Sequence, residues 1–122
     1  MATQTVDEFF EGKPKSRAIF ETVAARIERQ GPSTVEVKSQ ISFAVNRKFA
    51  WFWLYNVTQQ NPSGVLHVQL ALHHRVDEPR VRDISQTGRN RWNHQVVIRT
   101  LDDARSVWLG DLLEQAYAYG GG

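Results

Sequence analysis

Cysteine is absent from the 122-residue chain. Its absence excludes disulfide bonds, thiolate nucleophiles and cysteine-based zinc or iron–sulfur sites, and it is compatible with a reducing compartment. Long apolar runs are absent too, since no stretch approaches the roughly 20 apolar residues that span a bilayer. The polar, acidic start at residues 1–8 lacks the basic and apolar segments of a signal peptide. We therefore expect a cytoplasmic protein without a membrane partner.

A large excess of one charge sign is also missing. Fifteen basic residues stand against thirteen acidic ones, which gives a net charge of +2. The chain is therefore not a polycation, and any basic surface has to come from local clustering. Basic residues cluster between positions 75 and 99, with Arg75, Arg80, Arg82, Arg89, Arg91 and Arg99 against Asp77, Glu78 and Asp83.

The sequence motifs of common enzymes do not occur. There is no P-loop, no Gly-x-Gly-x-x-Gly, no His-Glu-x-x-His and no Gly-x-Ser-x-Gly. A Ser/His/Asp site can still assemble from distant positions, because its residues are adjacent only in space. The adjacent His73 and His74 would point to opposite faces of a strand, so they cannot share one metal ion unless the strand has ended. We lean away from an enzyme and expect no catalytic residue, no metal and no cofactor.

What is present fits one globular domain over residues 1–122, with flexible ends at 1–4 and 120–122. Thr5 and Glu8 form a capping box, which predicts a short helix through Phe10. Apolar residues then recur at helical spacing over residues 15–29. Pro14 suits the entrance of that second helix, and Gly31-Pro32 ends it.

The middle of the chain changes to a period of two residues, which is typical of strands. The strand over residues 49–55 is apolar on both faces, which favours a central position in a sheet. Asn46-Arg47 is expected as a two-residue hairpin turn, and residues 75–93 as a long loop. The predicted strands are residues 34–38, 41–45, 49–55, 65–73 and 94–99.

A final helix is predicted to begin at Thr100, which repeats the capping pattern, and to end at Gly120. Its expected apolar face is Ala104, Trp108, Leu109, Leu112, Leu113 and Ala116. The fold class is therefore α+β, with N-terminal helices and a mainly antiparallel sheet of four or five strands. The C-terminal helix packs on one face of that sheet.

Four segments in this order carry a resemblance that covers residues 6–119. They are Phe9-Phe-Glu-Gly-Lys-Pro14, Val37-Lys-Ser-Gln-Ile-Ser-Phe43 with Arg47-Lys-Phe-Ala50, Trp92-Asn-His-Gln-Val-Val-Ile98, and Leu101-Asp-Asp with Trp108-Leu and Ala116-Tyr117. Together they resemble a bacterial domain-of-unknown-function family of small α+β proteins. The resemblance implies the fold and a bacterial origin, and it carries no established activity.

The strongest candidate site is an aromatic sheet face. Trp51, Trp53 and Tyr55 alternate along one strand and are expected to point the same way, joined by Phe49. If His67, Gln69 and His73 share that face, the sheet has an aromatic floor with polar edges that could stack a planar ligand or a sugar. The alternative is that the rings pack beneath the helices as ordinary core.

Three smaller candidates complete the set. Lys38 and Gln40 flank a bend and could form a polar notch that contacts a phosphate or carboxylate, or they could be a solvated strand end. Arg91 and Trp92 combine a cation with an aromatic ring, the mixture that favours nucleic acid, although a solvated loop is the alternative. His94 opens the last strand, where a structural hydrogen bond is its expected role.

The leading hypothesis is a non-enzymatic module that binds an unknown small ligand or protein through the aromatic face and the Arg-rich loop. A nucleic-acid-binding domain is the first alternative, and it requires Arg89, Arg91 and Trp92 to lie beside the aromatic face. An enzyme is the second alternative, and it requires His94 to converge with Lys38 or His73 within about 3–4 Å. An open aromatic face would also suit a homodimer.

Overall fold

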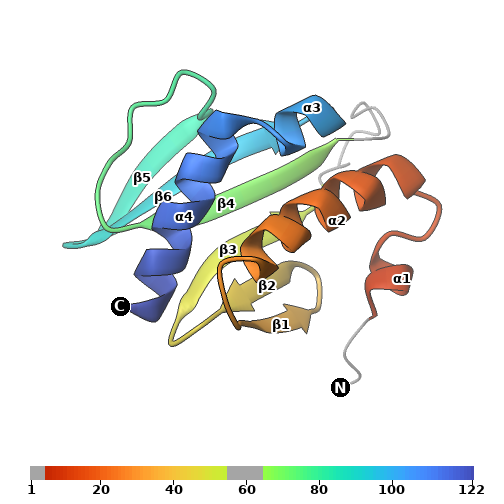
Figure 1. Cartoon of the computed structure of the whole chain (residues 1–122), viewed down its shortest axis with the longest axis horizontal. Coiled ribbons are helices and arrows are strands. Elements are labelled where there is room, and N and C mark those ends of the chain that lie inside the picture. Colours follow the sequence, from red (N-terminus) through yellow and green to blue (C-terminus); the bar gives the residue numbers. More distant parts are fainter. Residues whose placement is uncertain (1–4, 55–64) are drawn as a thin grey trace.

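The computed structural model describes residues 5–54 and 65–122. Tyr55, which the sequence places on the aromatic face, lies outside these ranges. Six strands form one antiparallel sheet in the order β1-β2-β3-β4-β6-β5 (Figure 1). The elements are α1 (Val6–Phe9), α2 (Pro14–Glu28), β1 (Thr34–Val37), β2 (Ile41–Ala44), β3 (Lys48–Trp53), β4 (Leu66–Leu72), β5 (Asp83–Gly88), β6 (Arg91–Ile98), α3 (Leu101–Ala104) and α4 (Val107–Gly121).

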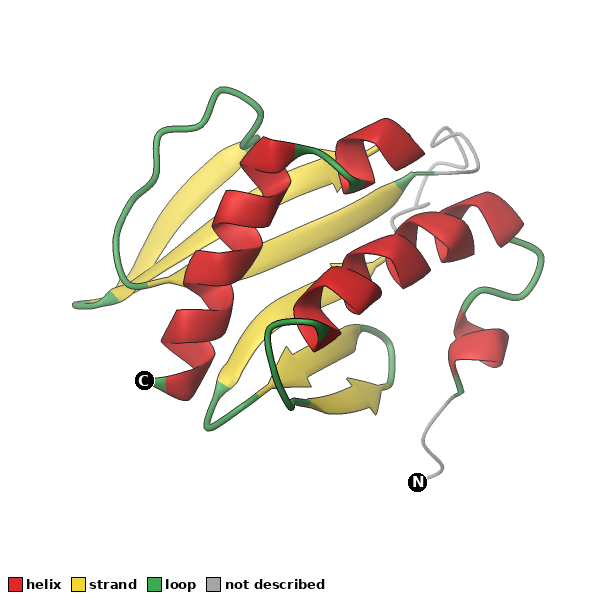
Figure 2. Ribbon diagram, viewed as in Figure 1, coloured by secondary structure: helices red, strands yellow, loops and turns green. Residues whose placement is uncertain are grey.

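The predicted α+β class is confirmed, with helices α2 and α4 lying across the same face of the sheet (Figure 2). Helix α4 packs on β3 and β4, and α2 packs on β4 and against α4. Within the described residues, no helix covers the opposite face of the sheet, which we call the open face. Among the described residues, the sheet therefore has one face covered by helices and one face without a helix.

Alternation along the central strands decides which side chains enter the core. Phe52 and Leu70 point toward the helices and are fully buried, and they lie on β3 and β4. Phe52 meets Phe20 of α2 with ring centroids 5.2 Å apart and meets Phe43 of β2 at 5.5 Å, both edge to face. These aromatic contacts join α2 to the sheet.

The helix starts follow the sequence as expected. The Thr5–Glu8 capping box is present, with the Glu8 amide donating to Thr5 Oγ1 at 3.1 Å and the Thr5 amide donating to Glu8 Oε1 at 3.1 Å. Pro14 begins α2, as predicted. Gly12 lies between α1 and α2 and separates the two helices. Its φ of 73° is in the left-handed region, which favours glycine.

The prediction of a long loop over residues 75–93 is wrong for the second half of that segment. Residues 83–88 form β5, an edge strand that pairs with β6, and β6 itself begins at Arg91. Almost every β5 side chain is exposed, because an edge strand beyond the helix layer has no face to bury. Such a strand shows no apolar alternation, so periodicity could not find it.

The prediction of a single final helix is also wrong, because the helix is interrupted after Ala104. Ser106 has extended backbone angles, with φ −66° and ψ 154°, and its hydroxyl donates to the Asp103 carbonyl oxygen at 2.6 Å. The break lets α3 pack on β6 while α4 crosses β4 and β3. Thr100 does cap α3, since its hydroxyl accepts from the Asp103 amide at 3.1 Å.

A bulge on β3 changes the face of Phe49. Ala50 pairs with Phe43, but Lys48 pairs with Ala44, so Phe49 is an extra residue between the two pairs. Its ring turns to the helix side and lies 5.7 Å from the Tyr117 ring of α4. The expectation that Phe49 joins the aromatic open face is therefore wrong.

The β2–β3 connection has three residues, 45–47, rather than two, and it docks on the end of α4. The backbone amides of Asn46 and Arg47 both donate to the Gly120 carbonyl oxygen, at 2.9 and 3.1 Å. Their side chains donate to the carbonyl oxygens of Gly121 and Tyr119, at 2.9 and 2.8 Å. These donors bind carbonyls of the last helical turn. The Gly120 and Gly121 carbonyls have no partner inside the helix, whereas the Tyr119 carbonyl also accepts from the Gly122 amide. The sequence predicts flexibility at residues 120–122, and in the structure two of these glycines accept hydrogen bonds from the hairpin.

Candidate functional site

The open face carries a hollow of about 430 Å³. Its lining combines two indole rings, three carboxamides and one guanidinium, from Gln40, Trp51, Trp53, Gln69, Arg91 and Gln95. We call this the open-face hollow. It contains no carboxylate among its lining side chains.

Strand register brings these side chains together. Trp51 of β3 lies opposite Gln69 of β4, and Gln69 lies opposite Gln95 of β6. Residues directly opposite each other in a sheet point to the same face, so the three side chains form a row across the sheet. Trp53 pairs with His67 in the neighbouring row. The prediction that Trp51, Trp53, His67 and Gln69 share one face is confirmed.

Hydrogen bonds fix the polar part of the hollow. Gln95 Nε2 donates to Gln69 Oε1 at 3.3 Å, which links the two carboxamides. Arg91 Nε donates to Asn93 Oδ1 at 3.3 Å, and Asn93 Nδ2 donates to Thr87 Oγ1 at 3.4 Å. The Arg91 guanidinium carbon lies 5.3 Å from the centroid of the Trp51 ring, a cation–π contact. The guanidinium is thus oriented by Asn93 and by Trp51.

His67 lies beside the hollow with its ring stacked on Trp53, at a centroid distance of 5.6 Å and an interplanar angle of 22°. Burial lowers the pKa of His67, and the positive charges of Arg82 and Arg99 lower it further. The neutral imidazole is therefore favoured near neutral pH. Arg82 and Arg99 also add positive potential at this side of the open face.

Lys38 and Gln40 separate in the structure, although both lie in the bend between β1 and β2, as predicted. Gln40 lines the hollow. Lys38 instead lies 3.6 Å from Glu36, which also pairs with Lys48 at 3.0 Å. The hydrogen bond from Lys48 and the charges of Lys38 and Lys48 lower the pKa of the Glu36 carboxyl. Lys38 is an edge charge with a partner, outside the lining of the hollow.

His73 does not share the open face, so that expectation is wrong. Strand β4 ends at Leu72, and the chain bends before the alternation can continue. The His73 ring lies 5.2 Å from the ring of Tyr119 in α4, on the helix side of the sheet.

His94 and Trp92 also lie on the helix side. Trp92 pairs with Leu72 and His94 pairs with Leu70, two fully buried residues of that face. His94 accepts a hydrogen bond at Nε2 from the Val76 amide at 3.0 Å, and its Nδ1 lies 3.0 Å from the Trp92 carbonyl oxygen. This pair of contacts requires the neutral tautomer with the proton on Nδ1. Burial is the main cause that lowers the pKa of His94.

These placements decide the two alternatives. Nucleic-acid binding requires Arg91 and Trp92 on one surface, and they point to opposite faces of β6. The enzyme alternative requires His94 to meet Lys38 or His73. Both ring nitrogens of His94 are engaged by backbone groups, and Lys38 lies four strand spacings away, at about 4.8 Å each. The surface that nucleic-acid binding requires is therefore absent, and His94 does not meet Lys38.

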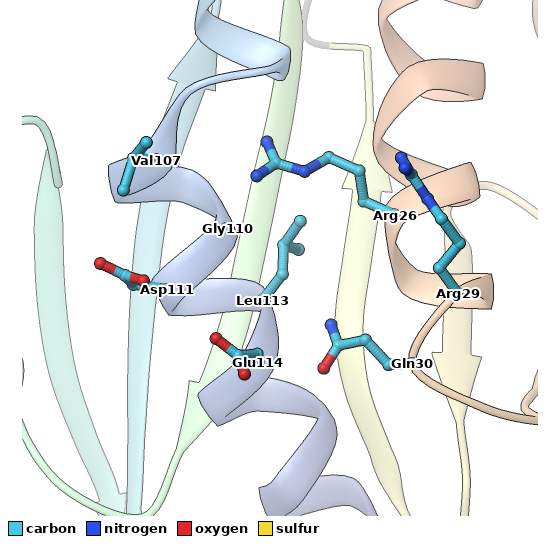
Figure 3. Close-up of a pocket in the computed structure, with 8 residues that line it drawn as sticks. All are labelled: Arg26, Arg29, Gln30, Val107, Gly110, Asp111, Leu113 and Glu114. Atoms are coloured by element: carbon cyan, nitrogen blue, oxygen red, sulfur yellow. The ribbon is translucent and has the colours of Figure 1, made fainter.

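A second hollow, of about 400 Å³, lies between α2 and α4 (Figure 3). Arg26 reaches across it from α2, and its Nη1 donates to the Ala104 carbonyl oxygen at 2.7 Å. Gly110 leaves room for this guanidinium, since a Cβ there would overlap Arg26 Nη2. Acidic and basic side chains share its walls: Arg26, Arg29, Asp111 and Glu114. We call this hollow the interhelix cleft, and its main polar feature, Arg26, has a structural role in joining α2 to the end of α3.

Two contributors to the open-face hollow were missed from the sequence, Gln95 and Asn93. Gln95 enters because β6 pairs with β4, a neighbour that is not next to it along the chain. Asn93 falls in the segment that the sequence predicts as a loop, whereas β6 begins at Arg91. In β6, Arg91 and Asn93 point to one face and Trp92 points to the other.

Metal-binding groups and membrane-spanning helices are absent from the described part of the chain. It holds no group of three or more histidine or acidic side chains placed to bind a metal ion. None of its helices combines the length and apolar character needed to cross a membrane.

Comparisons with known proteins agree with the resemblance noted above. Neither the curated proteins nor the solved structures contain a match to the chain. A family model described as "Domain of unknown function (DUF5655)" matches residues 6–119, nearly the whole chain. The chain belongs to this domain-of-unknown-function family.

Proposed function

We propose that this protein is a non-enzymatic binding module whose open sheet face holds a small ligand. The observation that carries the proposal is the open-face hollow, where Trp51, Trp53 and Arg91 meet three glutamine carboxamides. No helix of the described residues covers this face. Its volume of about 430 Å³ falls within the roughly 300–1,000 Å³ of typical ligand sites.

The chemistry of the lining supports a ligand more than a structural role. Trp51 and Trp53 are partly exposed, whereas Ala50 and Phe52 between and beside them are fully buried under the helices. Large rings on a solvent-facing surface expose apolar area to water, which smaller residues would not do. Such rings are common where planar groups are bound. The carboxamides add donors and acceptors that can orient a polar ligand.

The concave shape favours a small molecule over a second copy of the chain. Two sheets that pack face to face need apolar side chains along most of the contact. Here the row through Trp51 continues into Ser42 and Glu36 on one side and into Gln69, Gln95 and Asp83 on the other. A homodimer through this face would therefore bury several polar groups.

The four tryptophans provide the test. Trp51 and Trp53 report on the open face, while Trp92 and Trp108 lie on the helix side and act as internal controls. Nitrogen-15 correlation spectra would follow the four indole N–H signals, assigned through Trp→Phe variants. The probes are adenosine 5′-monophosphate, adenosine, N-acetylglucosamine and glucose, each at millimolar concentration.

Binding in the hollow predicts saturable shifts of the Trp51 and Trp53 signals with at least one probe, while those of Trp92 and Trp108 stay fixed. The proposal fails if no probe moves either open-face signal. It fails equally if only the helix-side signals move, since the ligand would then bind elsewhere.

A further inference from the structure

Most of the hydrogen-bond donors of the Arg91 guanidinium have no partner among the described residues. Its Nε is bonded to Asn93, and neither terminal nitrogen forms a hydrogen bond or ion pair within the described residues. A guanidinium fork of this kind matches a carboxylate or phosphate, which can accept two parallel hydrogen bonds. Asn93 and the Trp51 ring hold the fork in place before any ligand arrives.

Nothing in the hollow neutralises this charge. None of the six lining side chains is acidic. Glu36, which lies in the Trp51 row two strands away, is engaged by Lys48 and Lys38. Asp83 stands opposite Gln95 on the edge strand β5 and is the nearest acid of that row on the other side.

Further positive charge lies near His67 at the same face. Arg82 and Arg99 are close enough to act electrostatically on its ring, and neither forms an ion pair within the described residues. The charge around the hollow is therefore predominantly positive, which complements an anion.

The rest of the lining suits a ring. Trp51 and Trp53 offer indole surfaces at the rim, and stacking of a planar ring on such a surface contributes to binding without requiring one particular ring chemistry. Gln40, Gln69 and Gln95 can donate to or accept from ring heteroatoms. Anionic and aromatic recognition thus meet in one hollow.

We infer that the ligand is a small aromatic anion, whose ring stacks on the open-face tryptophans while its carboxylate or phosphate binds the Arg91 fork. This inference rests on the proposed function and adds the chemical class of the ligand. The interhelix cleft of similar volume does not share the inference, since Asp111 and Glu114 oppose its arginines and Arg26 is already bonded to Ala104.

Calorimetric titration with four probes separates the parts of the inference. Adenosine 5′-monophosphate carries a ring and a phosphate, nicotinate carries a ring and a carboxylate, adenosine carries the ring alone, and inorganic phosphate carries the anion alone. At least one of the two ring anions should bind more tightly than adenosine and inorganic phosphate. Added salt should weaken its binding while leaving any binding of adenosine unchanged.

Variants then assign the anion to Arg91. Arg91→Gln should weaken binding of the ring anion roughly 10-fold or more, because charge-assisted hydrogen bonds are lost. Arg91→Lys should recover part of the affinity, since the charge remains but the fork does not. Arg89→Gln, two residues away in the exposed β5–β6 turn, is the matched control and should change affinity less than two-fold. Unchanged indole spectra of the free variants would verify their folds.

The outcomes distinguish the inference from the proposed function. If adenosine binds as tightly as both ring anions and Arg91→Gln has no effect, the ligand class is wrong while the binding site stands. If inorganic phosphate binds as tightly as the ring anions, the stacking part is wrong. If Arg89→Gln and Arg91→Gln weaken binding equally, bulk charge rather than the positioned fork is responsible. If no probe binds and no indole signal moves, the proposed function fails with the inference.

Discussion

The two faces of β3 and β4 differ in what their side chains do. Toward the helices, Phe52 and Leu70 are fully buried and pack into a continuous core. Toward the open face, their chain neighbours Trp53 and Gln69 are partly exposed and line a hollow. The helix face is accounted for by burial of apolar area. The open face holds large rings, carboxamides and a guanidinium whose arrangement burial does not require, so its side chains are the ones to test for function.

The largest expected difference in stability is between variants at Phe52 and at Trp53. Phe52→Ala removes a fully buried ring from an aromatic cluster and should lower the free energy of unfolding by about 3–5 kcal/mol. Trp53→Ala removes a partly exposed ring stacked on His67 and should cost about 1–2 kcal/mol. Urea titration of both variants measures the difference. Equal losses would mean that the open face is as tightly packed as the core.

The next effect concerns the end of α4, where two adjacent glycines differ. A Cβ at Gly120 would lie 2.5 Å from Phe49 Cδ1, so Gly120→Ala should destabilise the fold by about 1–3 kcal/mol. At Gly121 the nearest atom would be Val45 Cγ1 at 4.0 Å, so Gly121→Ala should change stability by less than about 0.5 kcal/mol. Thermal unfolding of the pair compares them. A tolerated Gly120→Ala would show that the helix end does not press on the β3 bulge.

The third prediction concerns how the stability of the fold depends on pH through His94, the buried histidine on the helix side. Because burial lowers the pKa of His94 below its unfolded value near 6.5, the folded protein binds fewer protons than the unfolded chain. Its contribution to stability is full above pH 6.5 and is lost as the pH falls below that value. The slope is at most about 1.4 kcal/mol per pH unit for each such histidine. His67, whose pKa is lowered in the same direction, adds to the loss.

Stability measured between pH 7.5 and pH 5 in roughly half-unit steps tests this account. His94→Gln should be less stable than the parent at pH 7.5, because the hydrogen bond with the Val76 amide is disturbed, and its stability should fall less steeply with acid. Ser85→Ala, an exposed change that removes no titratable group, serves as the control and should keep the parent slope. An unchanged slope in His94→Gln would remove His94 as a source of acid sensitivity.

The smallest effects compare two guanidiniums. Arg26→Gln loses the hydrogen bond to the Ala104 carbonyl oxygen across the interhelix cleft and should lower stability by about 1 kcal/mol. Arg91→Gln should leave stability within about 0.5 kcal/mol, because the guanidinium is oriented by its neighbours but holds no element of the fold together. Chemical denaturation resolves the two variants. A larger loss for Arg91→Gln would indicate that this arginine is structural.

Local patterns in the sequence predicted much of this fold. The Thr5–Glu8 box, the apolar spacing of α2 and the alternation of β1 to β4 each depend on neighbouring residues, and each is present. Strand β5 escaped prediction because an exposed edge strand has no apolar period. The break between α3 and α4 and the bulge at Phe49 depend on packing against distant elements, which local spacing does not report.

The candidate site divides in the same way. Alternation groups Trp51 with Trp53 and His67 with Gln69, and the register of β3 with β4 puts the two pairs on one face. Adding Gln95 required the pairing of β4 with β6, which are separated along the chain by β5. The sequence predicts Arg91 and Trp92 as neighbours in a loop, but as residues of β6 their side chains lie on opposite faces of the sheet. Tertiary register, rather than composition, determined which polar groups share the hollow.

The absence of cysteine allows the most direct test of the central claim that one face of the sheet is open for binding. Gln69→Cys and Leu70→Cys place a single thiol on the two faces of β4, and a chromogenic disulfide reagent measures how fast each reacts. We predict rapid labelling of Gln69→Cys at a rate independent of protein concentration, and labelling of Leu70→Cys limited by unfolding. Slow labelling of Gln69→Cys, or labelling that slows as the protein is concentrated, would contradict the account, because the face would then be covered.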